Sequence, residues 1–169
     1  KESFIEGKGF FNFSRQEGDL NWHLYTFNIG DLLAEESASG TASVLGQLSI
    51  DSKDCILTFS GDFHKLILTS VAANSGNLSG SLHLNNRKNV QLSFAARKAS
   101  TCKTVIEDFS LNTNGTLDDF STTVIMSGFS GQAFKSNLAF SVANLSTLSV
   151  DTASLNLGPN RIFLDKPAS

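Results

Sequence analysis

Histidine and serine side chains are the first groups in this 169-residue chain to consider for catalysis or metal binding. The three histidines, His23, His64 and His83, lie on separate stretches, and no pair has the i, i+2 or i, i+4 spacing of a metal site. Ser130 stands in Gly-Phe-Ser-Gly-Gln, but a nucleophile elbow requires glycine where Gln132 stands and a helix after it. The sequence therefore predicts structural or surface histidines and a glycine-rich turn around Ser130.

Carboxylates occur as adjacent pairs at Glu35-Glu36 and Asp118-Asp119. No partner group can be identified for either pair, so solvated loop charges are expected rather than an acid/base pair. A calcium-binding loop pattern is also missing. We therefore expect no catalytic residues, no metal site and no cofactor, and we predict that the protein is not an enzyme.

Charge and composition exclude further classes of protein. The net charge is -3, the pI is about 5.5, and the basic residues are scattered, so nucleic acid is not an expected partner. Only 17% of the residues are charged, and Ser, Thr and Asn supply most of the polarity, which is typical of extracellular β-proteins. No apolar run is long enough to span a bilayer, so no transmembrane segment is predicted. The chain looks like a mature secreted protein or a domain of a larger one.

The two cysteines, Cys55 and Cys102, are not in a CxxC pair, which argues against zinc or thioredoxin-like chemistry. In an extracellular composition they favour one disulfide between them, and the alternative is two buried free thiols. Glycosylation triplets point to the same compartment. Predicted acceptors are Asn77, Asn114 and Asn144, while Asn12, within a Phe-rich strand, is the poorest candidate.

Alternation of apolar and polar residues predicts strands along most of the chain. It is clear in the stretch 77–112, where two alternating runs flank an Asn-rich loop and indicate an antiparallel hairpin. The run 20–29 is apolar on both faces, which predicts a central strand covered twice. Asn114-Gly115 predicts a type I′ turn. The only helix candidate is a short segment beginning at Asp31.

Strands about ten residues apart, separated by turn residues, predict a single all-β domain over residues 1–169. The expected architecture is an antiparallel sandwich or a barrel-like curved sheet of about 8–11 strands, with at most one short helix.

The aromatic residues indicate the kind of ligand. The chain has 14 Phe but one Trp and one Tyr, and Phe lacks the hydrogen-bonding group that favours sugar- and protein-binding surfaces. The phenylalanines form either an ordinary core or the wall of a cavity for an apolar ligand. Predicted ligand-binding residues are Trp22, Tyr25, Phe27, Phe129, Phe134 and Phe140.

These features favour a secreted, non-catalytic carrier of a hydrophobic small molecule (a lipid, sterol or pigment) held within the β-structure. The first alternative is an extracellular cell-surface or matrix interaction module without a ligand cavity, and a third class is an enzyme whose site is assembled from distant residues. A homo-oligomer is compatible with each of these functions.

Overall fold

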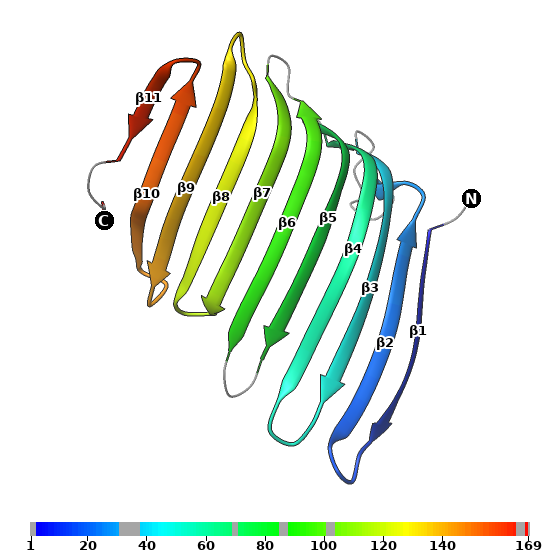
Figure 1. Ribbon diagram of the computed structural model, residues 1–169. Coiled ribbons are helices and arrows are strands. Elements are labelled where there is room, and N and C mark those ends of the chain that lie inside the picture. Colours follow the sequence, from blue (N-terminus) through cyan, green and yellow to red (C-terminus); the bar gives the residue numbers. More distant parts are fainter. Residues whose placement is uncertain are drawn as a thin grey trace.

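The computed structural model describes residues 3–30, 38–68, 71–84, 88–100, 104–164 and 168. These form one antiparallel sheet of eleven strands whose spatial order follows the chain order, from β1 to β11 (Figure 1). The strands are β1 (Phe4–Asn12), β2 (Glu17–Thr26), β3 (Ser39–Ile50), β4 (Cys55–Leu68), β5 (Val71–His83), β6 (Asn89–Ser100), β7 (Val105–Thr116), β8 (Phe120–Phe129), β9 (Ala133–Ala143), β10 (Thr147–Leu157) and β11 (Asn160–Phe163).

The prediction of an all-β, antiparallel fold of about 8–11 strands is confirmed, and the described residues form one open sheet rather than a sandwich or a closed barrel. The predicted central hairpin is β5–β6, in which Leu82 pairs with Val90. The prediction that the run 20–29 is a central strand is wrong, because this run forms β2, which is next to the edge strand β1. The helix candidate beginning at Asp31 falls outside the described residues.

The predicted turn at Asn114-Gly115 is also wrong, because both residues lie within β7. Gly115 has a φ of 147°, so its conformational freedom serves a distortion of the strand rather than a turn. The chain reverses just after it, where the Thr116 amide donates to the Asp119 carbonyl at 2.6 Å. The Thr116 hydroxyl also accepts from the Asp119 amide at 3.0 Å, which stabilises this turn.

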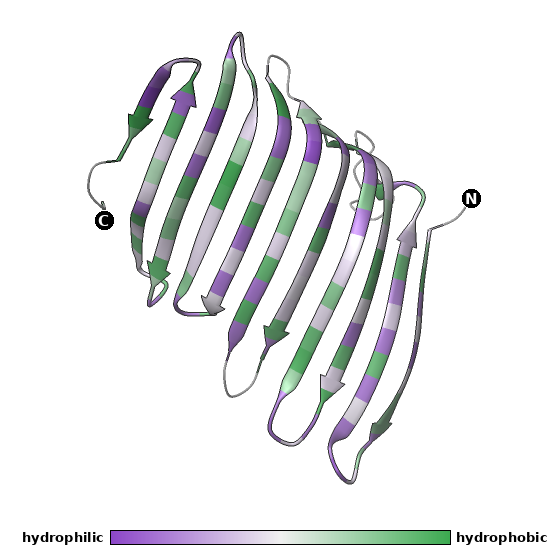
Figure 2. Cartoon of the chain, in the orientation of Figure 1, coloured by the Kyte–Doolittle hydropathy of each residue, from purple (hydrophilic) through white to green (hydrophobic). Residues whose placement is uncertain are grey.

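The two faces of the sheet differ strongly in polarity. Side chains that pair across antiparallel strands share a face, and successive residues alternate between faces. On β4, Leu57, Phe59 and Phe63 therefore share one face, and Thr58 and Ser60 share the other. The same alternation appears as bands of hydrophobic and hydrophilic residues along most strands (Figure 2). We call the two surfaces the apolar face and the polar face.

Local irregularities in β3, β4, β6 and β7 cross the sheet near one end. Register shifts occur between Ser39 and Thr41 and between Ile106 and Asp108, while Lys65 and Lys98 have φ values of 51° and 50°. Such bulges change the side-chain alternation within a strand. As a result, small and apolar residues beyond the bulges remain on the apolar face.

The most buried apolar cluster lies on this face around the bulges. It consists of Phe63, Ala73, Ala96 and Ala99, and Phe94 is one of the half-buried residues that pack against it. The Phe63 and Phe94 rings are stacked with centroids 5.6 Å apart. Most of the strand residues elsewhere are half-buried or exposed, as expected for a single layer.

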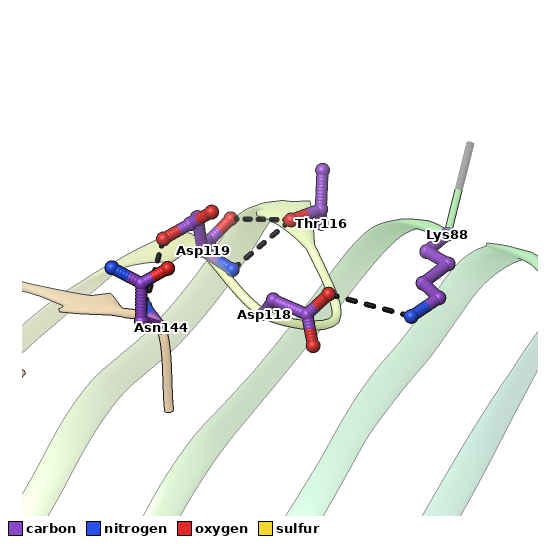
Figure 3. A network of polar contacts seen from close by, with 5 residues as sticks. All are labelled: Lys88, Thr116, Asp118, Asp119 and Asn144. Atoms are coloured by element: carbon purple, nitrogen blue, oxygen red, sulfur yellow. Dashed lines mark hydrogen bonds and ion pairs between the residues drawn. The ribbon is translucent and has the colours of Figure 1, made fainter. Parts of the chain in front are cut away.

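The turns at the opposite end are joined to one another (Figure 3). Lys88 follows β5, and its carbonyl accepts from the Leu117 amide in the β7–β8 turn at 2.8 Å. Asp119 in that turn accepts from the Asn144 amide in the β9–β10 turn at 2.9 Å. The Lys88 ammonium is 3.5 Å from the Asp118 carboxylate. The β5–β6, β7–β8 and β9–β10 connections are therefore held together by these hydrogen bonds and the ion pair.

Candidate functional site

The apolar face is the most extensive feature that could bind a ligand. Its side chains come from all eleven strands, so it spans ten interstrand spacings, or about 48 Å. The cross-strand pairing places on it Ile5, Phe11, Trp22, Leu24, Val44, Leu48, Leu57, Phe59, Phe63, Leu78, Leu82, Val90, Leu92, Phe94, Phe109, Leu111, Phe120, Val124, Met126, Leu138, Phe140, Val142, Leu155 and Ile162.

No second layer of described residues covers this face, and most of its side chains are half-buried against one another. The chain has 11045 Å² of accessible surface, whereas a globular monomer of 18.1 kDa has about 8,100 Å². The excess reflects the single-layer architecture, because no second sheet of described residues lies against either face. Large apolar surfaces without a covering layer are common at interaction sites, so this face is the candidate site.

Several aromatic rings on the apolar face lie over glycines of neighbouring strands. The indole of Trp22 covers Gly46, and the ring of Phe59 covers Gly80, in both cases at a distance that leaves no room for a Cβ. Phe63 covers Gly76 in the same way. Rings that occupy the space above glycines project less from the sheet. These aromatic side chains of the apolar face therefore protrude little from the sheet, and an extended molecule could lie along it.

Two shallow hollows lie towards the edges of the apolar face. One, of about 370 Å³, is lined by residues that include Phe11, Leu20, Leu48 and Ile50, from β1 to β3. The other, of about 360 Å³, lies over β9 to β11 and is lined by Leu138, Ala153, Leu155, Ile162 and others. Both volumes fall within the usual range for small-molecule sites, although neither hollow is closed.

The six predicted ligand-binding residues are divided between the two faces. Trp22 lies on the apolar face, as do Phe134, which pairs with Gly128, and Phe140, which pairs with Thr122. Tyr25 and Phe129 lie on the polar face, since they pair with Ser43 and Ala133. Phe27 follows the end of β2. The structure therefore does not bring all six together.

The apolar face as a whole was not predicted. On β4, the residues Cys55, Leu57, Phe59 and Phe63 follow one another at even spacing, and the positions between them include Thr58 and other polar residues. Applied to every strand, this alternation would have separated the two faces. The predicted ligand-binding residues were all aromatic, whereas most side chains of the apolar face are aliphatic.

On the polar face, aromatic residues gather beside the N-terminal edge. Phe4 stacks on Tyr25 with centroids 5.7 Å apart, and Tyr25 contacts Phe27 edge-on at 4.6 Å. His23 lies in the same cluster, with Nε2 at 2.9 Å from the Ser43 hydroxyl and Nδ1 at 3.6 Å from the Glu6 carboxylate. This arrangement gives His23 structural partners.

The other groups considered for chemistry lie apart. His64 is exposed on β4, and His83 Nδ1 lies 3.4 Å from the Asp54 carboxylate without forming a hydrogen bond. Within the described ranges, no three His, Cys, Asp or Glu residues are grouped as metal ligands would be. Ser130 lies in the exposed β8–β9 turn, as predicted.

The predicted disulfide requires correction, because Cys55 carries a free thiol. Cys55 begins β4 at the end of the sheet where β5 finishes. Cys102 lies outside the described residues, and Ser100, the last described residue before it, is at the other end of the sheet, paired with Ala72. Long antiparallel strands thus separate the two ends, which the sequence-based pairing did not take into account.

The potential glycosylation sites are accessible. Asn77 and Asn114 are exposed within β5 and β7, and Asn144 is exposed in the β9–β10 turn. Asn12, at the end of β1, is also exposed, and its side-chain oxygen accepts from the amides of Ser14 and Arg15.

No family model, curated protein or solved structure matches this chain significantly. In the part of the chain that the structure describes, no helix has the length and hydropathy required to cross a membrane.

Proposed function

We propose that this protein is a non-catalytic carrier of hydrophobic small molecules, and that the acyl chains of lipids lie along its apolar face. The observation that supports this function is the continuity of that face from β1 to β11 without a covering layer among the described residues. Transfer of apolar ligand surface from water to this face is favourable by about 25 cal/mol per Å².

An extended lipid fits this surface better than a compact ligand does. The face is long and open, so an acyl chain can contact several strands while a polar head group remains in water. The rings of Trp22 and Phe59 are half-buried and lie over glycines, whereas Phe63 is only 3% exposed and belongs to the buried cluster. Sterols and polyenes are the other ligand classes compatible with an open apolar face.

An extracellular location belongs to the same proposal. It is supported by the exposure of the four asparagines in glycosylation triplets and by the hydroxyl-rich polar face. The free thiol of Cys55 is compatible with either compartment, because partly buried cysteine also serves as a small apolar residue.

The alternative function, an interaction module, is favoured by the cluster of Phe4, His23 and Tyr25 on the polar face. Aromatic residues and histidine at an exposed edge provide contacts suited to a protein partner. In that case the polar face and the loops would carry the function, and lipids would not compete with the partner.

Titration of fatty acids, sterols and polyenes, followed through Trp22 fluorescence, tests the carrier function. Trp22 is the only tryptophan and lies on the apolar face, so a bound chain should change its emission in a saturable manner. Native mass spectrometry of the protein from its source should detect a co-purified apolar molecule. If none of the three ligand classes changes Trp22 emission and the native protein has the mass of the chain without a ligand, the carrier function is contradicted.

Two leucines on opposite faces provide a matched pair of variants. Leu20, on the apolar face, is 40% exposed, and Leu45, on the polar face, is 57% exposed. Leu20→Lys should weaken lipid binding by roughly 5- to 150-fold, which corresponds to the loss of about 1 to 3 kcal/mol of apolar contact. Leu45→Lys should bind as the unmodified protein does. Equal affinities for the two variants would contradict binding on the apolar face.

A further inference from the structure

The outer edge of β1 is long and regular, and no described residue pairs with it. All nine residues of β1 are exposed, although the strand pairs with β2 over its whole length without a register shift. Edge strands are usually shortened, bulged or interrupted by proline, because a free edge can pair with another chain. The other edge strand, β11, has only four residues. The two edges therefore differ, and β1 is the one available for pairing.

The side chains of β1 also favour a partner. Ile5 is 70% exposed and Phe10 is 64% exposed, and they project from opposite faces of the strand. Apolar residues on both faces of an edge strand become partly buried when a neighbouring strand is added, because each strand covers the sides of the next.

We propose that β1 pairs antiparallel with β1 of a second copy, about a two-fold axis that passes through Gly7 perpendicular to the sheet. In this register Glu6 lies opposite Lys8 of the second copy, and Lys8 lies opposite its Glu6. Phe4 lies opposite Phe10 on the same polar face. Opposite charges and aromatic pairs at directly facing positions both stabilise strand pairing.

The apolar face supports the same register. There Ile5 lies opposite Gly9 of the second copy, where the absence of a side chain leaves room for the isoleucine, and Gly7 meets Gly7 on the axis. A two-fold axis perpendicular to the sheet keeps both apolar faces on the same side. The dimer would therefore carry one apolar face that continues from one copy into the other.

Charge reversal at the two complementary positions tests this register. Lys8→Glu places two glutamates opposite each other at both facing pairs, and Glu6→Lys places two lysines opposite each other in the same way. Each variant should raise the dimer dissociation constant at least about tenfold, measured by analytical ultracentrifugation, because like charges directly opposite destabilise pairing. Lys8→Glu is the cleaner change, since Glu6 also lies 3.6 Å from His23.

A mixture of the two variants provides the decisive comparison. The two chains together restore both opposite-charge pairs, so a heterodimer should form where neither chain alone dimerises. The double variant Glu6→Lys/Lys8→Glu should recover the homodimer. Lys135→Glu, at an exposed position within β9, is the control for the change in net charge and should dimerise normally.

A monomeric unmodified protein at all concentrations would overturn the proposal. So would dimers of Lys8→Glu as stable as those of the unmodified protein, which would indicate contact through a face. Open-ended assemblies would indicate pairing of β1 with β11 instead and would also overturn it. Circular dichroism of each variant establishes that a loss of dimer is not a loss of folding.

Discussion

The indole ring of Trp22 lies over the backbone of Gly46, the residue directly paired with it on β3. An alanine in place of a strand glycine usually stabilises a protein by about 0.5 to 1 kcal/mol. At Gly46, however, the added methyl group would overlap the indole, and overpacking costs about 1 to 3 kcal/mol. We therefore expect Gly46→Ala to lower the free energy of unfolding in urea and to alter Trp22 emission.

Gly7→Ala is the control for this substitution. Gly7 lies on the same face, and a methyl group added there would have its nearest neighbouring atoms 3.3 Å away, so a small adjustment accommodates the change. A stability of Gly46→Ala equal to that of Gly7→Ala would mean that the indole does not occupy this position.

The backbone of Lys98 leads to a second prediction. Its φ of 50° is unfavourable for a residue with a Cβ by about 1 to 2 kcal/mol, but not for glycine. Lys98→Gly should therefore leave the free energy of unfolding unchanged or raise it by up to about 1 kcal/mol. Lys135→Gly, in an ordinary strand, should lower it by about 0.5 to 1 kcal/mol. If Lys98→Gly and Lys135→Gly lower the free energy of unfolding in urea by the same amount, the backbone of Lys98 is not strained.

A third prediction concerns pH and the β3–β4 turn. Hydrogen bonds from the amides of Lys53 and Asp54, each at 2.7 Å, hold the pKa of Asp51 below its usual value of 3.8. The charged carboxylate therefore stabilises the fold above that value, and this contribution is lost as the pH falls through the lower folded-state pKa.

Asp51→Asn keeps the acceptor oxygen but removes the titration. The variant should have a lower urea midpoint than the unmodified protein at neutral pH, and the difference should disappear in strong acid. A difference between the two midpoints that is independent of pH would contradict the role of the charge.

Asp119→Ala tests the connection between the turns. The substitution removes the acceptor of the Asn144 amide and should cost about 1 kcal/mol in the free energy of unfolding. Asp108→Ala is the comparison, because its carboxylate is 3.9 Å from exposed Arg97 and such a surface pair contributes little. Similar losses for both variants would show that the shared turn contact adds no stability.

Much of the fold follows from residue alternation. The predicted hairpin and the antiparallel all-β class are present because apolar and polar positions alternate over most strands. Alternation specifies that one face avoids water, but it does not specify what covers that face. A sandwich and a single open layer therefore have the same local pattern, and the single layer could not be distinguished in advance.

The site was only partly predictable for a related reason. Trp22 and Tyr25 are both aromatic, but their odd separation in a regular strand places them on opposite faces. Aromatic type alone therefore could not locate the ligand surface. The type I′ turn predicted at Asn114-Gly115 needs positive φ at both residues, but only Gly115 has it, within β7. The hydroxyl and backbone of Thr116 stabilise a later reversal.

The agreement between spatial and chain order determines how the size of the apolar face can vary. Each strand is flanked by its immediate predecessor and successor, so inserting or deleting a hairpin changes the sheet by two strands without altering its connectivity. Each hairpin adds or removes about 10 Å of apolar surface. The number of hairpins therefore sets the length of the apolar face and, under the proposed carrier function, the longest acyl chain that could lie along it.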